Sequence, residues 1–127
     1  MSSTTIFINN KTGKCYNLMS GSHKIAHVKK HTQYSFKLPL PHHDNKYTLV
    51  QKSNSSNVIK FTVDKNGQIS KYCGNSSVNT HVSKESDQYM ALSSDRGTGT
   101  GIVWDVKFCT PVWSPHNSKL TLSKSMC

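Results

Sequence analysis

The sequence predicts an all-β fold, namely a single compact β-sandwich or closed barrel of about eight short antiparallel strands. Short segments in which apolar and polar residues alternate recur along the chain at a spacing of about ten residues. Clusters of Gly, Pro, Asn, Asp and Ser separate them, as expected for tight turns. Helix-favouring glutamate occurs once, as Glu85. Neither an internal repeat nor a composition shift divides the chain, so residues 1–127 are expected to form one domain.

The clearest alternation lies in residues 97–110. One face of a strand there would carry the apolar residues Ile102, Trp104, Val106 and Phe108. This segment is predicted to be the central strand, on which shorter strands pack.

Several other segments are predicted to be strands by the same two-residue period. Asp64 and Gly67 have the positions and types of a turn that closes a β-hairpin. The predicted strands are residues 4–9, 15–19, 33–38 and 46–52 and the hairpin partners 58–63 and 68–73.

The later part of the chain is less regular. Residues 74–87 are weakly patterned and are expected to form a long loop. Residues 89–92 suit a short strand or one helical turn, and residues 120–122 suit a last edge strand. Pro111 and Pro115 are expected to keep the intervening Trp113 out of regular strand pairing.

Three histidines, His23, His27 and His31, recur every four residues. On a helix this spacing would form a stripe that could chelate zinc or copper. A strand or irregular segment is favoured instead, with successive histidines about 13 Å apart at ~3.3 Å per residue. A metal site or a pH response therefore remains open. Protonation of all seven histidines would raise the formal charge from +10 to +17.

The formal net charge of +10 favours anionic partners such as acidic membranes, polyanionic glycans or nucleic acid. Lysine supplies all of the basic side chains except Arg96. Because base-specific recognition depends on bidentate side chains such as arginine, only non-specific nucleic-acid binding is considered. Its expected surface combines aromatic and basic side chains: Tyr34, Tyr72, Lys37 and Lys71.

Sequence motifs for catalysis or cofactor binding are not evident. The run from Gly97 to Gly101 lacks the phosphate-loop spacing and precedes a predicted strand rather than a helix. The six carboxylates are too dispersed to predict an acid–base pair, and no nucleophile elbow occurs. We therefore expect a non-enzymatic protein without a cofactor.

The predicted function is that of a binding module, either lectin-like and carbohydrate-binding or attached to acidic membrane surfaces. An exposed Trp113 in a polar loop could stack on a sugar or lie at a membrane interface. The candidate ligand-binding residues are Trp113, Asn117, Tyr89 and Arg96.

The four cysteines are dispersed, with no C-x-x-C pair. Since the first residues lack the apolar region of a signal peptide, a cytoplasmic location is expected, with an unconventional export route left open. No apolar run is long enough for a transmembrane helix. In the cytosol the cysteines would be free thiols, whereas an oxidising compartment would permit three disulfide connectivities.

Overall fold

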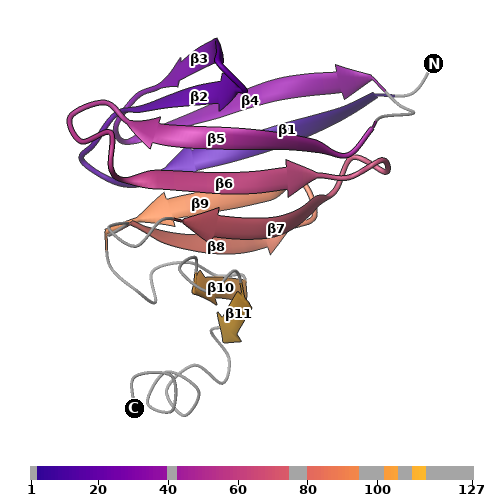
Figure 1. Ribbon diagram of the computed structural model, residues 1–127. Helices are drawn as coiled ribbons and strands as arrows, with labels where there is room; N and C mark the ends of the chain where they lie inside the picture. Colours follow the sequence, from indigo (N-terminus) through magenta and orange to yellow (C-terminus); the bar gives the residue numbers. More distant parts are fainter. Residues whose placement is uncertain (1–2, 40–42, 75–79, 95–101, 106–109, 114–127) are drawn as a thin grey trace.

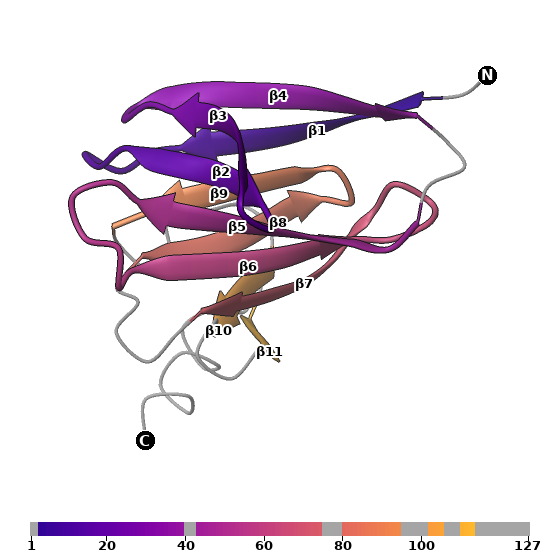
Figure 2. The ribbon, with the colours of Figure 1, turned by 45° about the horizontal axis from the view of Figure 1, so that its top comes forward.

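The computed structural model describes residues 3–39, 43–74 and 80–94, and the backbone of residues 102–105 and 110–113. Within these residues the secondary structure consists of strands in two sheets, without a helix. Figures 1 and 2 show the sheets packed face to face. The all-β prediction is confirmed, and the two open sheets make the fold a sandwich rather than the closed barrel also considered.

The first sheet has six strands in the order β11-β10-β8-β9-β1-β4. Neighbouring strands in this sheet are antiparallel, except that β1 and β9 run parallel. The prediction of purely antiparallel pairing is therefore wrong for this pair. The strands are β1 (Ser3–Asn10), β4 (Thr32–Pro39), β8 (His81–Ser86), β9 (Tyr89–Ser93), β10 (Ile102–Asp105) and β11 (Thr110–Trp113).

The second sheet has five antiparallel strands in the order β3-β2-β5-β6-β7. Its members come from one stretch of the chain, interrupted by β4. The strands are β2 (Tyr16–Ser20), β3 (His23–Val28), β5 (Asn45–Gln51), β6 (Val58–Val63) and β7 (Ile69–Gly74).

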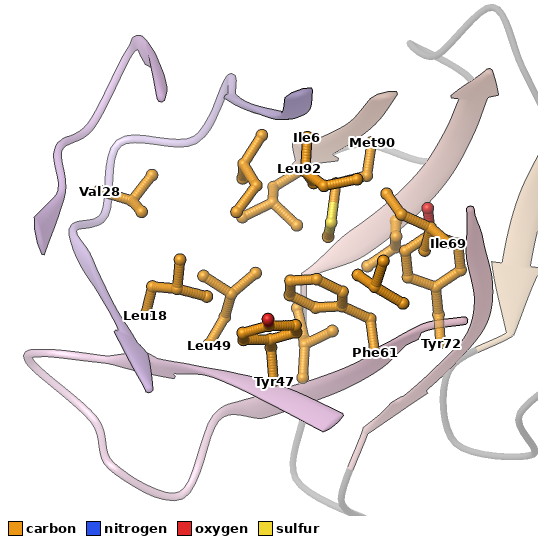
Figure 3. Close-up of a cluster of buried hydrophobic side chains, with 14 of the residues drawn as sticks. Ile6, Leu18, Val28, Tyr47, Leu49, Phe61, Ile69, Tyr72, Met90 and Leu92 are labelled. Atoms are coloured by element: carbon orange, nitrogen blue, oxygen red, sulfur yellow. The ribbon is translucent and has the colours of Figure 1, made fainter. Parts of the chain in front are cut away.

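The core lies between the sheets and is built from alternate residues of the facing strands, because successive side chains of a strand point to opposite faces. Both sheets contribute fully buried aliphatic side chains, as Figure 3 shows. They include Ile6, Leu18, Leu49, Ile69 and Leu92.

Aromatic rings form a continuous series through the core from one sheet to the other. Phe36 of β4 contacts Tyr47 of β5 at a centroid distance of 5.4 Å, which links the sheets. Tyr47 in turn stacks on Phe61 at 5.5 Å, and Phe61 contacts Tyr72 at 6.5 Å. Burial raises the pKa of the Tyr72 hydroxyl, so this ring stays neutral.

Three expectations for the later part of the chain need correction. Residues 81–86, expected in a long loop, form β8, and their pairing to β9 and β10 compensates for a weak apolar pattern. Of the predicted central strand, Ile102–Asp105 form β10, which lies one strand from the edge of the described sheet rather than at its centre. Residues 97–101 and 106–109 lie outside the described residues. Trp113 is paired with Val103 in the β10–β11 ladder despite the adjacent prolines.

Candidate anion-binding surface

Five lysines lie on the three turns that join β1 to β2, β3 to β4 and β5 to β6. These turns lie together at one end of the sandwich, the left end in Figure 1. We call this surface the lysine end, defined by Lys11, Lys14, Lys29, Lys30 and Lys52.

Buried Asn10 holds the first two of these turns together. Its side-chain amide donates to the carbonyl oxygens of Lys14 at 2.8 Å and Lys29 at 3.1 Å. Its Oδ1 accepts hydrogen bonds from the backbone and hydroxyl of Thr12, at 3.0 and 2.7 Å. The backbone of His31 also donates to the Thr12 carbonyl at 3.2 Å. One buried side chain thus fixes the position of two lysine-bearing turns.

The third turn is attached to the first by the backbone of Lys52, which donates to the carbonyl of Cys15 at 2.9 Å. Within this turn the Gln51 backbone donates to the Asn57 carbonyl at 3.0 Å, closing the loop. The lysine end is therefore a hydrogen-bonded unit, which limits the ordering entropy that binding would cost.

A surface pocket with a volume of about 350 Å³ lies between these turns. Binding sites for small molecules occupy roughly 300–1,000 Å³, so the pocket can hold a single small group. It is lined by Gly13, Lys14, Cys15, Lys30, Lys52 and Ser53.

A chain of buried polar side chains leads from the core to this pocket. Asn57 donates to the side-chain oxygen of Gln51, and Gln51 Nε2 donates to Ser53 Oγ at 2.8 Å. Deeper in the core, Asn57 contacts the hydroxyl of Thr80 at 3.2 Å and that of Tyr16 at 3.3 Å. Burial raises the pKa of Tyr16, despite these hydrogen bonds, and keeps its hydroxyl protonated.

Asp44, Asp64, Glu85 and Asp87, the acidic residues whose side chains the structure describes, lie toward the opposite end of the sandwich. Asp44 and Asp64 accept hydrogen bonds from backbone amides there, and Asp87 forms an ion pair with Lys84 at 3.2 Å. Glu85 is in the last part of β8, which runs toward the same end. The six residues of β6 separate the two ends by about 20 Å, more than two Debye lengths at physiological salt. These four carboxylates therefore do not neutralise the lysine end.

His27 lies beside the lysine end, with its Nδ1 3.3 Å from Asn17 Oδ1. Desolvation lowers its pKa, and the nearby charges of Lys52, Lys24 and Lys29 lower it further. The imidazole is therefore neutral at pH 7, and it is available to take up a proton if those positive charges become paired.

The three spaced histidines are not gathered at one point. His23 begins β3, His27 is near its end, and His31 follows in the turn with a φ of 56°. The strand interpretation of this segment is confirmed. Among the described residues, no group of three or more histidine, cysteine or acidic side chains is placed to hold a metal ion.

Of the predicted ligand-binding residues, Tyr89 is the one whose side chain the structure describes. Its ring stacks on Phe7 at 5.9 Å, and its hydroxyl accepts from Asn9 at 3.2 Å and donates to Gln33 at 3.1 Å. Tyr89 is half-buried on the outer face of the first sheet, away from the core. Arg96, Asn117 and the side chain of Trp113 lie outside the described residues.

The aromatic and basic surface expected for nucleic acid is not assembled. Tyr72 is fully buried in the core, on the opposite face of β7 from exposed Lys71. Tyr34 is half-buried on the inner face of β4 and stacks on Phe36 at 6.2 Å. Both tyrosines therefore contribute to packing rather than to a stacking surface.

The cysteines differ from one another. Cys15 is a free thiol at the lysine end, as expected. Cys73 is disulfide-bonded, which corrects the expectation of free thiols in the cytosol and agrees with the alternative of an oxidising compartment. Because thiols dispersed along a chain reveal no pairing until the strands are placed, sequence spacing could not detect this bond.

Sequence reasoning did not single out Lys14, Lys30 or Lys52. The available signal was the position of lysines in turns beside Gly13 and Ser53, but only the strand order shows that these turns meet. Comparison with family models, curated proteins and solved structures finds no match for this chain. Within the described residues, no helix has the length and apolar character needed to cross a bilayer. The site alone therefore supports the functional proposal.

Proposed function

We propose that the protein is a non-enzymatic binding module that attaches to acidic membrane surfaces through its lysine end. The supporting observation is that five lysines project from three joined turns, while the acidic side chains that the structure describes lie toward the far end. Such a patch attracts anionic lipid with about 1 kcal/mol per lysine near the surface.

Within the described residues, the geometry supports binding to an acidic membrane surface more than it supports a lectin that binds neutral sugars. Tyr89 is engaged by Phe7, Asn9 and Gln33. Three lysines, by contrast, face a pocket of about 350 Å³. Charge is thus the main recognition feature of this pocket.

The disulfide at Cys73 bears on where this binding would take place. Disulfides persist in oxidising compartments and are rare in the cytosol. We therefore propose that the protein is exported rather than cytoplasmic. Its target would then be the acidic outer face of a membrane.

Cosedimentation with vesicles tests the proposal. We expect binding to vesicles that contain phosphatidylglycerol, little binding to pure phosphatidylcholine, and loss of binding at about 0.5 M salt, where screening acts over a few ångströms. Salt-resistant binding to neutral glycans, or equal binding to neutral vesicles, would contradict it. Binding to nucleic acid without binding to vesicles would favour the non-specific nucleic-acid alternative.

Binding to acidic vesicles is expected to strengthen as the pH falls from 7.5 to 5.5. Besides desolvation, the charges of Lys24, Lys29 and Lys52 lower the pKa of His27, and anionic lipid offsets these charges. Lipid binding therefore raises the pKa of His27 and is coupled to uptake of a proton. Each added charge raises affinity by up to about fivefold. His27→Gln should flatten the pH profile more than His23→Gln, because His23 lies at the other end of β3. Equal profiles for the two variants would exclude this role for His27.

A further inference from the structure

We propose that the pocket of the lysine end is a selective site for a phosphate monoester, with the hydroxyl of Ser53 as its oriented hydrogen-bond donor. This inference rests on the proposed function and deepens it, since it names the chemical group recognised within an acidic surface.

The charge of the pocket suits a dianion. Lys14, Lys30 and Lys52 line this open pocket from three different turns, so their ammonium groups can approach one ligand group from three sides. A phosphate monoester has three terminal oxygens and up to two negative charges, whereas a phosphodiester has two such oxygens and one charge. Charge-assisted hydrogen bonds to lysine therefore favour the monoester.

Ser53 adds directional recognition that lysines alone do not supply. Its Oγ accepts the hydrogen bond from Gln51 Nε2, so its own proton points elsewhere. Ser53 is exposed and lines the pocket, so this proton is available to a ligand as well as to solvent. A phosphate oxygen in the pocket would accept it in place of water.

The buried polar chain holds the Ser53 oxygen in place. Gln51 is 5% exposed and Asn57 is fully buried, so neither side chain can exchange its partner for bulk water. Asn57 donates to Gln51, and Gln51 donates to Ser53, so the donors of the chain point toward the pocket. Aligned hydrogen bonds polarise one another and strengthen the last donor. The arrangement is that of a preorganised anion site.

The test compares two vesicle types adjusted to the same zeta potential. One contains phosphatidic acid, which carries a phosphate monoester, and the other contains phosphatidylglycerol, which carries a diester. The proteins are the unmodified chain and the variants Ser53→Ala, Ser53→Thr and Ser55→Ala. Ser53→Thr keeps the hydroxyl, and exposed Ser55 lies in the same turn outside the pocket lining. Thermal unfolding checks that each variant is folded.

We expect the unmodified chain to prefer phosphatidic acid by about tenfold, the effect of one charge-assisted hydrogen bond. Ser53→Ala should reduce this preference to the part that the three lysines supply, and the other two variants should keep it in full. Equal binding of the unmodified chain to both vesicle types would overturn the inference but leave the proposed function intact. Failure to bind either vesicle would overturn both.

A competition arm identifies the source of the ester. Excess glucose 6-phosphate, with glucose as control, is added to the phosphatidic acid vesicles. If glucose 6-phosphate competes and glucose does not, the pocket binds a soluble phosphate monoester as well as the lipid headgroup. A preference for phosphatidic acid without competition would assign it to the lipid headgroup.

Discussion

Replacing Lys14, Lys30 and Lys52 together by glutamate is expected to abolish binding to phosphatidylglycerol vesicles. Loss of three lysines near an acidic surface costs about 3 kcal/mol, roughly a hundredfold in affinity, and the introduced carboxylates add repulsion. These side chains line the pocket, so the change acts at the proposed contact itself. Vesicle cosedimentation at low salt measures the effect.

A matched control separates local charge from total charge. Lys37, Lys60 and Lys71 are exposed on strands rather than on the three turns. Both triple glutamate variants have a formal net charge of +4, because each replacement removes two charges from +10. We expect the control to bind within a few-fold of the unmodified protein. Equal losses in the two variants would mean that net charge, and not the lysine end, governs binding.

Phe61→Ala is expected to have the largest effect on stability, a loss of about 3–5 kcal/mol in the free energy of unfolding. Phe61 is 1% exposed and lies between the rings of Tyr47 and Tyr72. Its removal leaves a cavity in the aromatic series that links the sheets. Since a domain is stabilised by about 5–15 kcal/mol in total, urea denaturation should show a large drop in midpoint.

Phe7→Ala is the matched control, because it makes the same chemical change on the outer face of the first sheet. Phe7 is half-buried and has its described ring contact with Tyr89. We expect the free energy of unfolding to fall by about 1 kcal/mol, because the variant loses this ring contact and some buried apolar area. A larger loss for Phe7 than for Phe61 would mean that the stability of the protein does not depend chiefly on the core between the sheets.

The elements that could be predicted from sequence are those in which local chemistry and tertiary packing agree. The hairpin of β6 and β7 has strict alternation, and its turn has the expected form: Gly67 donates to the Asp64 carbonyl at 2.9 Å and has a φ of 78°. Because the left-handed conformation favours glycine, residue type alone located this turn.

Other elements depend on contacts between distant segments. In β8 the apolar pattern is too weak to indicate a strand, and its pairing with β9 and β10 determines its structure. The lysine end has the same origin. Lys14, Lys30 and Lys52 are separated by many residues and become neighbours only through the strand order. Net charge could predict an anionic partner but not the surface that would receive it.

The parallel pairing of β1 with β9 has a consequence for how the protein is made. During synthesis β1 leaves the ribosome before β9, its neighbour on one side. The two strands are about eighty residues apart in the chain. The second sheet can pair once residue 74 has left the ribosome, while one edge of β1 stays open. Pairs so distant along the chain slow folding. The hydrogen bond from Lys11 to the Leu92 carbonyl, 2.8 Å long, also awaits β9, so the lysine end is completed late in synthesis.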